Sequence, residues 1–79
     1  MEKVESKAVI EAILFAAGRE VSIQELSMAL EKPTEEIEII IKEMQEDYKT
    51  RGIEITKMED NYQLVSKKEY YEYIYPIID

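Results

Sequence analysis

The hydrophobic pattern of this chain changes its period once, and that change constrains the fold more than any other feature of the sequence. Apolar residues recur every three or four positions between Ile10 and Tyr48, as they do on the buried side of helices. From Ile53 onward they alternate with polar residues, as in half-buried strands. The sequence therefore predicts helices up to about Gly52 and strands beyond it.

Three helices are expected before the change. The first ends at Gly18, because glycine readily adopts the left-handed conformation that follows a helix C-terminus. Ser22 and Glu25 have the spacing of a capping box and begin the second helix, which ends before Pro33. Thr34 is expected to cap the third helix. The stripes expected to form the core are Ile10, Ile13, Leu14 and Ala17, then Ile23, Leu26 and Leu30, then Ile37, Ile40, Ile41, Met44 and Tyr48.

A β-hairpin and a short last helix are expected after Gly52. Asp60 and Asn61 supply a two-residue turn between the strands, since both residue types tolerate positive φ. Ser66 and Glu69 have the spacing of a second capping box and would open a tyrosine-rich helix, which we expect to pack onto the domain.

This order of elements is that of a winged helix-turn-helix. We expect one domain over residues 1–79, of the α+β class and mostly α. It would consist of three helices, a two-stranded wing and a short C-terminal helix.

The residue types needed for most catalytic chemistry are missing. The 79 residues include no Cys and no His, which removes thiolate nucleophiles, the usual general base and the common zinc ligands. Adjacent acids such as Glu35 and Glu36 are expected by chance among 18 acidic residues, and so small a domain has little room for a substrate pocket. We therefore expect no enzyme activity, no metal and no cofactor.

The charges of the predicted third helix and wing disfavour DNA binding. A winged helix usually presents its third helix to the major groove, and its grip on the backbone needs several cations. Here the net charge is −8, and the expected wing tip contains Glu59 and Asp60. The third helix carries Glu35, Glu36, Glu38, Glu43, Glu46 and Asp47 against Lys42, Lys49 and Arg51. A DNA-binding transcription regulator stays open as the alternative, and it would require a basic stripe on the assembled dimer.

The first predicted helix is apolar on both sides, so it needs a second cover in addition to the core. A chain this short has few elements to supply one, which predicts a homodimer. The candidate contacts are Val9, Ala12, Phe15 and Ala16, with Ile39 of the third helix as an addition. Two alternatives remain: the wing and last helix could cover the first helix within one chain, and Ile39 could be a lone exposed apolar residue.

Several stretches resemble the segregation and condensation protein B family. Residues 10–18, IEAILFAAG, are similar to the family's I-E-A-L-L-F-A-S-G, and residues 21–26, VSIQEL, to its V-S-x-x-E-L. Residues 52–55, GIEI, and 62–64, YQL, resemble its G-I-x-L … Y-Q-L hairpin. The chain departs from the family at the wing tip, where residues 59–61 replace the usual glycines.

The resemblance implies a protein-binding role in chromosome condensation and segregation. Members have two tandem winged-helix domains; the first mediates homodimerisation, and both contribute to binding the kleisin subunit of the bacterial condensin, an ATP-driven complex. This chain would be the first domain, without the second domain that makes much of the kleisin contact. The expected location is the cytoplasm, with nucleoid association through the complex and no membrane contact.

Overall fold

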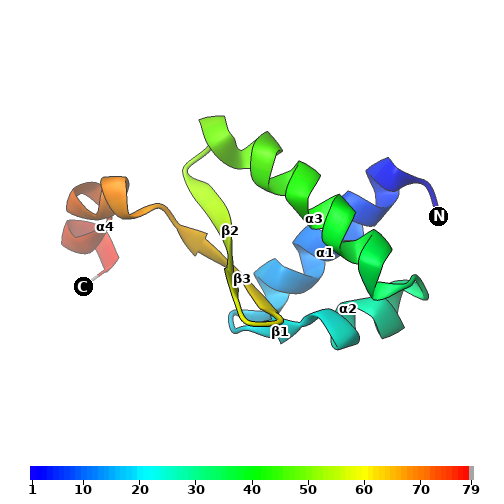
Figure 1. Ribbon diagram of the computed structural model, residues 1–79. Coiled ribbons are helices and arrows are strands. Elements are labelled where there is room, and N and C mark those ends of the chain that lie inside the picture. The colour runs from blue at the N-terminus through cyan, green and yellow to red at the C-terminus, as the bar shows by residue number, and fades with distance from the viewer. Residues whose placement is uncertain (79) are drawn as a thin grey trace.

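The computed structural model describes residues 1–78 and contains four α-helices, a three-stranded sheet and two 3-10 turns in that range (Figure 1). In chain order the elements are α1 (Lys3–Ala17), β1 (Val21–Ser22), α2 (Ile23–Leu30), α3 (Thr34–Asp47), η1 (Tyr48–Thr50), β2 (Ile53–Met58), β3 (Asn61–Ser66), η2 (Lys68–Tyr70) and α4 (Tyr71–Ile78). Helices α1 to α3 form one body, β2 and β3 form the wing beside it, and the molecule measures 41 × 22 × 20 Å. The predicted winged-helix fold is confirmed.

Local signals set the ends of α1 and α2 as predicted. Gly18 follows α1 with φ of 60°, in the left-handed region. The capping box of α2 forms in full: the Glu25 backbone N–H donates to Ser22 Oγ, and the Ser22 backbone N–H donates to Glu25 Oε1, each at 3.0 Å.

The start of α3 differs by one residue from the prediction. The cap position is Pro33, with extended φ and ψ of −60° and 150°, and Thr34 is already the first helical residue. The Pro33 carbonyl accepts the backbone N–H groups of Glu36 and Ile37, at 3.0 and 3.1 Å. Proline therefore begins the helix through its fixed φ and its carbonyl, and the Thr34 hydroxyl is not a cap.

The sheet has one strand more than the expected wing. β1 pairs with β3 antiparallel, so the strand order is β1-β3-β2. Asn61 pairs with Met58 across the hairpin and with Ser22 on the other side, which places it inside β3. The two turn residues are therefore Glu59, with φ of 56°, and Asp60, one position earlier than predicted.

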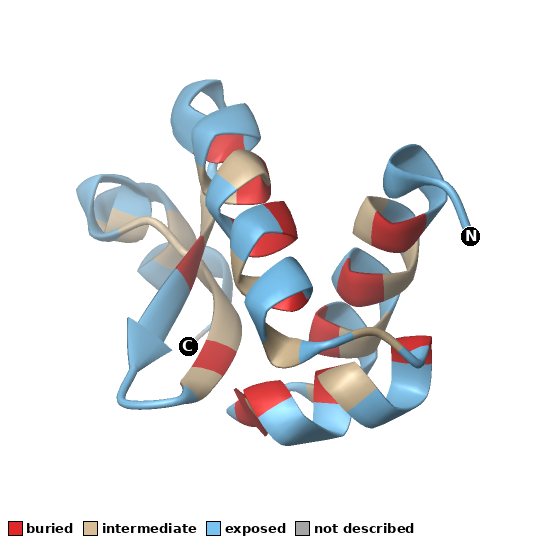
Figure 2. Ribbon diagram, turned by 45° about the vertical axis from the view of Figure 1, so that its right-hand side comes forward, coloured by how far each residue is buried: buried red, intermediate tan, exposed pale blue. Residues whose placement is uncertain are grey.

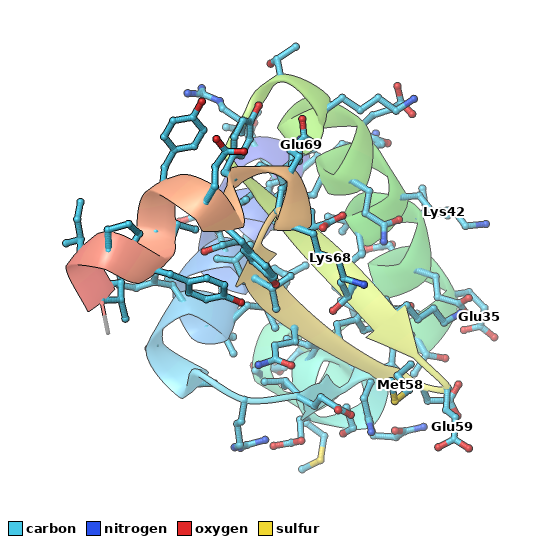
Figure 3. All side chains as sticks on the ribbon, turned by 90° about the vertical axis from the view of Figure 1, so that its left-hand side faces the viewer. Glu35, Lys42, Met58, Glu59, Lys68 and Glu69 are labelled. Carbon is cyan, nitrogen blue, oxygen red and sulfur yellow. The ribbon has the colours of Figure 1, made fainter. Side chains whose placement is uncertain are left out.

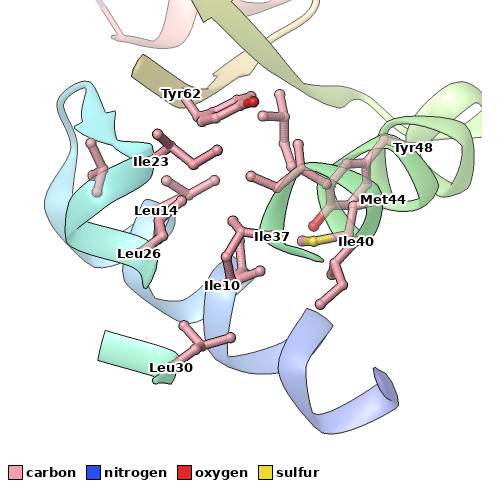
Figure 4. Packing of buried hydrophobic residues seen from close by; sticks show 13 residues of the cluster. Ile10, Leu14, Ile23, Leu26, Leu30, Ile37, Ile40, Met44, Tyr48 and Tyr62 are labelled. Carbon is pink, nitrogen blue, oxygen red and sulfur yellow. The ribbon is translucent and has the colours of Figure 1, made fainter. Parts of the chain in front are cut away.

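The core lies where the three helices meet the inner face of the sheet (Figures 2 and 4). Its 13 buried apolar side chains are Ile10, Leu14, Val21, Ile23, Leu26, Leu30, Ile37, Ile40, Ile41, Met44, Tyr48, Ile55 and Tyr62. Ile13 and Ala17 pack against it in part. The predicted helical stripes are thus confirmed, and the sheet contributes Val21, Ile55 and Tyr62.

The last helix differs most from the prediction. Ser66 pairs with Ile53 in the sheet, so it cannot cap a helix; α4 begins at Tyr71 after η2 and runs past Pro76 to Ile78. α4 projects away from the body (Figure 1), and Tyr73 is exposed. The expectation that the tyrosines pack this helix onto the domain is wrong.

Candidate protein-interaction surface

The inner side of α1 is fixed to α3 by ion pairs above the core. Lys3 Nζ lies 2.9 Å from Glu43 Oε2, and Lys7 Nζ lies 2.9 Å from Asp47 Oδ2. The hydrogen bond to Asp47 raises the pKa of Lys7, and the hydrogen bond from Lys3 lowers the pKa of Glu43. These pairs are solvent-exposed, so they orient α1 more than they stabilise the fold.

A tyrosine–carboxylate contact fixes the middle of α1. The Tyr48 hydroxyl donates to Glu11 Oε2 at 2.5 Å. Burial, followed by this hydrogen bond, raises the pKa of Tyr48, so the hydroxyl stays protonated as a donor. With one side of α1 held against α3, its other side faces outward as a surface of fixed shape.

The outer face of α1 is apolar and exposed. It consists of Val4, Ala8, Ala12, Phe15 and Ala16, all exposed, with Val4 and Phe15 each 79% accessible. Monomeric proteins rarely leave a phenylalanine so accessible within an apolar patch, and such patches mark interaction sites. We refer to these five residues as the α1 outer face.

The structure brings three of the five sequence-predicted candidates together and separates two. Ala12, Phe15 and Ala16 lie on the α1 outer face. Val9 is half-buried and packs against the core cluster. Ile39 is exposed on α3, and it does not line the hollows beside Phe15.

Sheet residues extend the surface around Phe15. Two shallow hollows flank this ring, and both are lined by Ile53 of β2 and Leu64 of β3. Ala12 lines one hollow and Gly18 the other. The alternation that begins at Ile53 predicts a strand there, but it does not link Ile53 to the first helix. Val4 and Ala8 could have been found, because positions 4, 8, 12 and 15 repeat at helical spacing.

The face that a DNA-binding winged helix would use carries mixed charge (Figure 3). Glu35 and Lys42 lie along α3, and Glu59 lies at the wing tip beside Met58. The first turn of α3 has the acids Glu35 and Glu36 and no cation. This arrangement supplies no basic stripe for a phosphate backbone.

Other kinds of site are not found in the part of the chain that the structure describes. Within residues 1–78, no group of three or more acidic side chains is arranged to hold a metal ion. Over the same residues, no helix combines the length and apolar character needed to cross a membrane. The outer side of α1 with the adjoining sheet is therefore the strongest candidate surface.

Comparison with known proteins assigns the family. The family model described as "Segregation and condensation complex subunit ScpB" matches residues 8–79. The chain belongs to this family. The resemblance of residues 10–18 and of the hairpin is thereby confirmed, and the family is one of chromosome segregation and condensation subunits.

Curated relatives share the whole domain but are longer. Segregation and condensation protein B of Alkaliphilus oremlandii is 47% identical, with 94% of this chain and 41% of the relative covered. The Clostridioides difficile protein is 40% identical, covering 100% and 46%, and that of Bacillus subtilis is 34% identical, covering 100% and 42%. The chain thus spans less than half the length of these relatives.

Two solved structures have the same fold. A dimer of an ScpB N-terminal domain complexed with an ScpA peptide is 31% identical with a TM-score of 0.87, covering 94% of this chain and 95% of that one. ScpB from Mycobacterium tuberculosis has a TM-score of 0.91 at 20% identity, covering 99% of this chain and 50% of that one, and supports the fold alone.

Proposed function

We propose that this chain is a non-catalytic interaction domain that forms a homodimer and binds a segment of the kleisin subunit of the bacterial condensin. Through these contacts it would act in chromosome condensation and segregation. The observation that carries the proposal is the related ScpB N-terminal domain, which is a dimer in complex with an ScpA peptide. This chain matches that domain over nearly its full length.

The α1 outer face is the surface proposed for self-association. Phe15 is a large, rigid anchor, and aromatic residues of this kind dominate the energetics of protein interfaces. Ala12 and Ala16 beside it are small, which lets a partner helix approach closely. Ile53 and Leu64 of the sheet line both hollows beside Phe15.

The domain organisation is part of the same proposal. The relatives are more than twice as long as the segment they share with this chain. We take residues 1–79 as the first of two winged-helix domains of a cytoplasmic protein, with the second domain adding further kleisin contacts.

Direct DNA binding is not favoured as a second function. The net charge is −8, and acids occupy both the first turn of α3 and the tip of the wing. A contribution to DNA compaction would pass through the partner complex.

The dimer surface is tested with a charge on the α1 outer face. Ala12→Glu would place an unpaired carboxylate in the interface, so it should leave a folded monomer. Ala29→Glu is the matched control, because Ala29 is also an exposed helical alanine but lies on α2. The measurement is the mass by light scattering with the fold followed by circular dichroism. An unchanged mass for Ala12→Glu would contradict this assignment of the interface.

The kleisin contact is tested by titrating the domain into a fluorescent ScpA peptide and following anisotropy. We expect saturable binding that an unrelated peptide of equal charge does not reproduce. Absence of binding at about 1 mM domain, where the association free energy is only about −4 kcal/mol, would contradict this part of the proposal.

A further inference from the structure

Residues 68–78 form an arm whose direction is set by the residues at its root. The arm consists of η2 and α4, and α4 packs mainly against η2 rather than against the three helices α1 to α3. It extends away from these helices in Figure 1, and Ile77 near its end is 82% exposed. The direction of the arm therefore depends on the few contacts made where it leaves the sheet.

Lys67, the residue before the arm, makes three hydrogen bonds to the segment between α3 and β2. Its side-chain Nζ donates to the backbone carbonyl of Tyr48 at 2.7 Å and to that of Lys49 at 3.1 Å. Its backbone N–H donates to the carbonyl of Gly52 at 2.9 Å. Both the main chain and the side chain of Lys67 are therefore tied to the same short segment.

The Lys67 ammonium group lies at a helix end that attracts positive charge. The last carbonyls of a helix have no partner within the helix, and the helix dipole makes this end negative. The last turn of α3 has no basic residue, and Tyr48 is its cap residue. Lys67 supplies the missing cation from a position 19 residues after Tyr48. A neutral side chain at position 67 would take this cation away from both carbonyls.

The point to which Lys67 binds is itself fixed. Tyr48 is 8% exposed within the core cluster, and its hydroxyl donates to Glu11 of α1. On the side of the arm, the Tyr70 backbone N–H donates to the Lys67 carbonyl at 3.1 Å. The Tyr70 ring lies beside Gly52, where an added Cβ would be 4.0 Å from Tyr70 Cδ2. The first turn of the arm is thus joined, through Lys67, to a residue held by the core and by α1.

We propose that Lys67 is a clamp that fixes the direction of the arm relative to the three helices, and that its positive charge keeps the clamp closed. Lys67 is a positioning residue, because it acts through the carbonyls at the end of α3. With its two side-chain hydrogen bonds formed, the arm has one direction. Without them, the arm swings as a unit about its root. The clamp acts within one chain, so it depends neither on the proposed dimer nor on kleisin binding.

Distances between two spin labels test the clamp. The native chain has no cysteine, so the labels are attached through Met28→Cys on α2 and Ile77→Cys on the arm, both at exposed positions. Labelled protein is diluted into an excess of unlabelled protein, so that pulsed electron paramagnetic resonance measures distances within one chain. We expect a single narrow distance distribution when Lys67 is present.

Substitutions at position 67 separate the charge from the length of the side chain. Lys67→Met keeps an unbranched side chain but removes the charge, so the narrow distribution should be lost; Lys67→Gln, a second neutral variant, should have the same effect. Lys67→Arg keeps the charge and the donors and should preserve the narrow distribution. Lys68→Met is the matched control, because Lys68 is the adjacent lysine and is exposed (Figure 3).

A clamp differs from a contact that only stabilises the fold. Either would lower the urea midpoint of Lys67→Met, but only a clamp changes the direction of the arm in protein that circular dichroism shows to be folded. A broad distribution with Lys67 present, or a narrow one in folded Lys67→Met or Lys67→Gln, would overturn the proposal. Equal broadening in Lys68→Met would also overturn it, and broadening in Lys67→Arg would overturn the role of the charge.

Discussion

Leu14 and Met28 provide a direct test of which helix sides form the core. Leu14 is 1% exposed, at the meeting point of α1 with the other helices (Figure 4), whereas Met28 faces solvent from α2. Leu14→Ala removes three carbon atoms from a packed site and leaves a cavity, which costs about 2–5 kcal/mol. Met28→Ala also shortens an apolar side chain but opens no cavity, so its effect should lie within about 0.5 kcal/mol.

The size of the Leu14 effect is large for this domain. At about 0.05–0.15 kcal/mol per residue, 79 residues give a free energy of unfolding of roughly 4–12 kcal/mol. With a urea m-value of about 1 kcal/mol/M, Leu14→Ala should lower the midpoint by about 2–5 M, or abolish the folded state if the wild type is at the low end. The assay is urea unfolding followed by circular dichroism, at one fixed protein concentration. Equal midpoints for Leu14→Ala and Met28→Ala would refute the packing of α1 described here.

Three further predictions concern a buried hydroxyl, a capping carboxylate and the charge of the domain. Ser6 is fully buried and, among residues 1–78, its hydroxyl has no hydrogen-bond partner. Because Ser6→Ala removes this unpaired polar group, it should raise the free energy of unfolding, measured in urea, by about 1 kcal/mol. A loss of stability would contradict this prediction. The backbone N–H of Ser22 donates to the Glu25 carboxylate and lowers the pKa of Glu25 below 4.5. This contact therefore stabilises the folded domain above pH 4.5, and its contribution is lost as the pH falls through the lowered pKa of Glu25. The urea midpoint should therefore fall between pH 5 and pH 3, and fall less in Glu25→Gln; equal falls would show that this contact does not matter. Duplex DNA at about 150 mM salt should not bind more tightly than the non-specific range of about 10⁻⁴–10⁻⁶ M, and a tighter titration would contradict the charge argument.

Signals carried by neighbouring residues predicted the helical part of the fold. The capping box at Ser22 and the glycine at position 18 act within a few residues, and both predictions are confirmed. The core stripes were also predictable, because helical spacing decides which side is buried once a helix exists. Three helices that each carry a stripe of core residues then have few ways to pack in so short a chain.

The errors arose where distant segments compete for the same residues. Asn61 has the chemistry of a turn residue, but pairing with both Met58 and Ser22 holds it in β3 and moves the turn to Glu59. Ser66 has the spacing of a cap, but its pairing with Ile53 extends the strand and delays the last helix. Strand pairing joins residues that are far apart in the sequence, so the spacing of neighbouring residues does not predict it.

The candidate surface was predictable in part for the same reason. The apolar excess on the first helix pointed to Phe15 and Ala12 directly. Ile53 and Leu64 join them only because the wing folds back beside α1. None of these neighbours is close to Phe15 in the sequence.

The mass of the unmodified domain across a series of concentrations tests the central claim most directly. A monomer weighs 9.3 kDa, so a homodimer weighs twice that, or 18.6 kDa. Light scattering at micromolar to millimolar concentrations should show the mass rising to the dimer value and holding there. A mass that stays at 9.3 kDa throughout would contradict the account of this chain as a self-associating interaction domain.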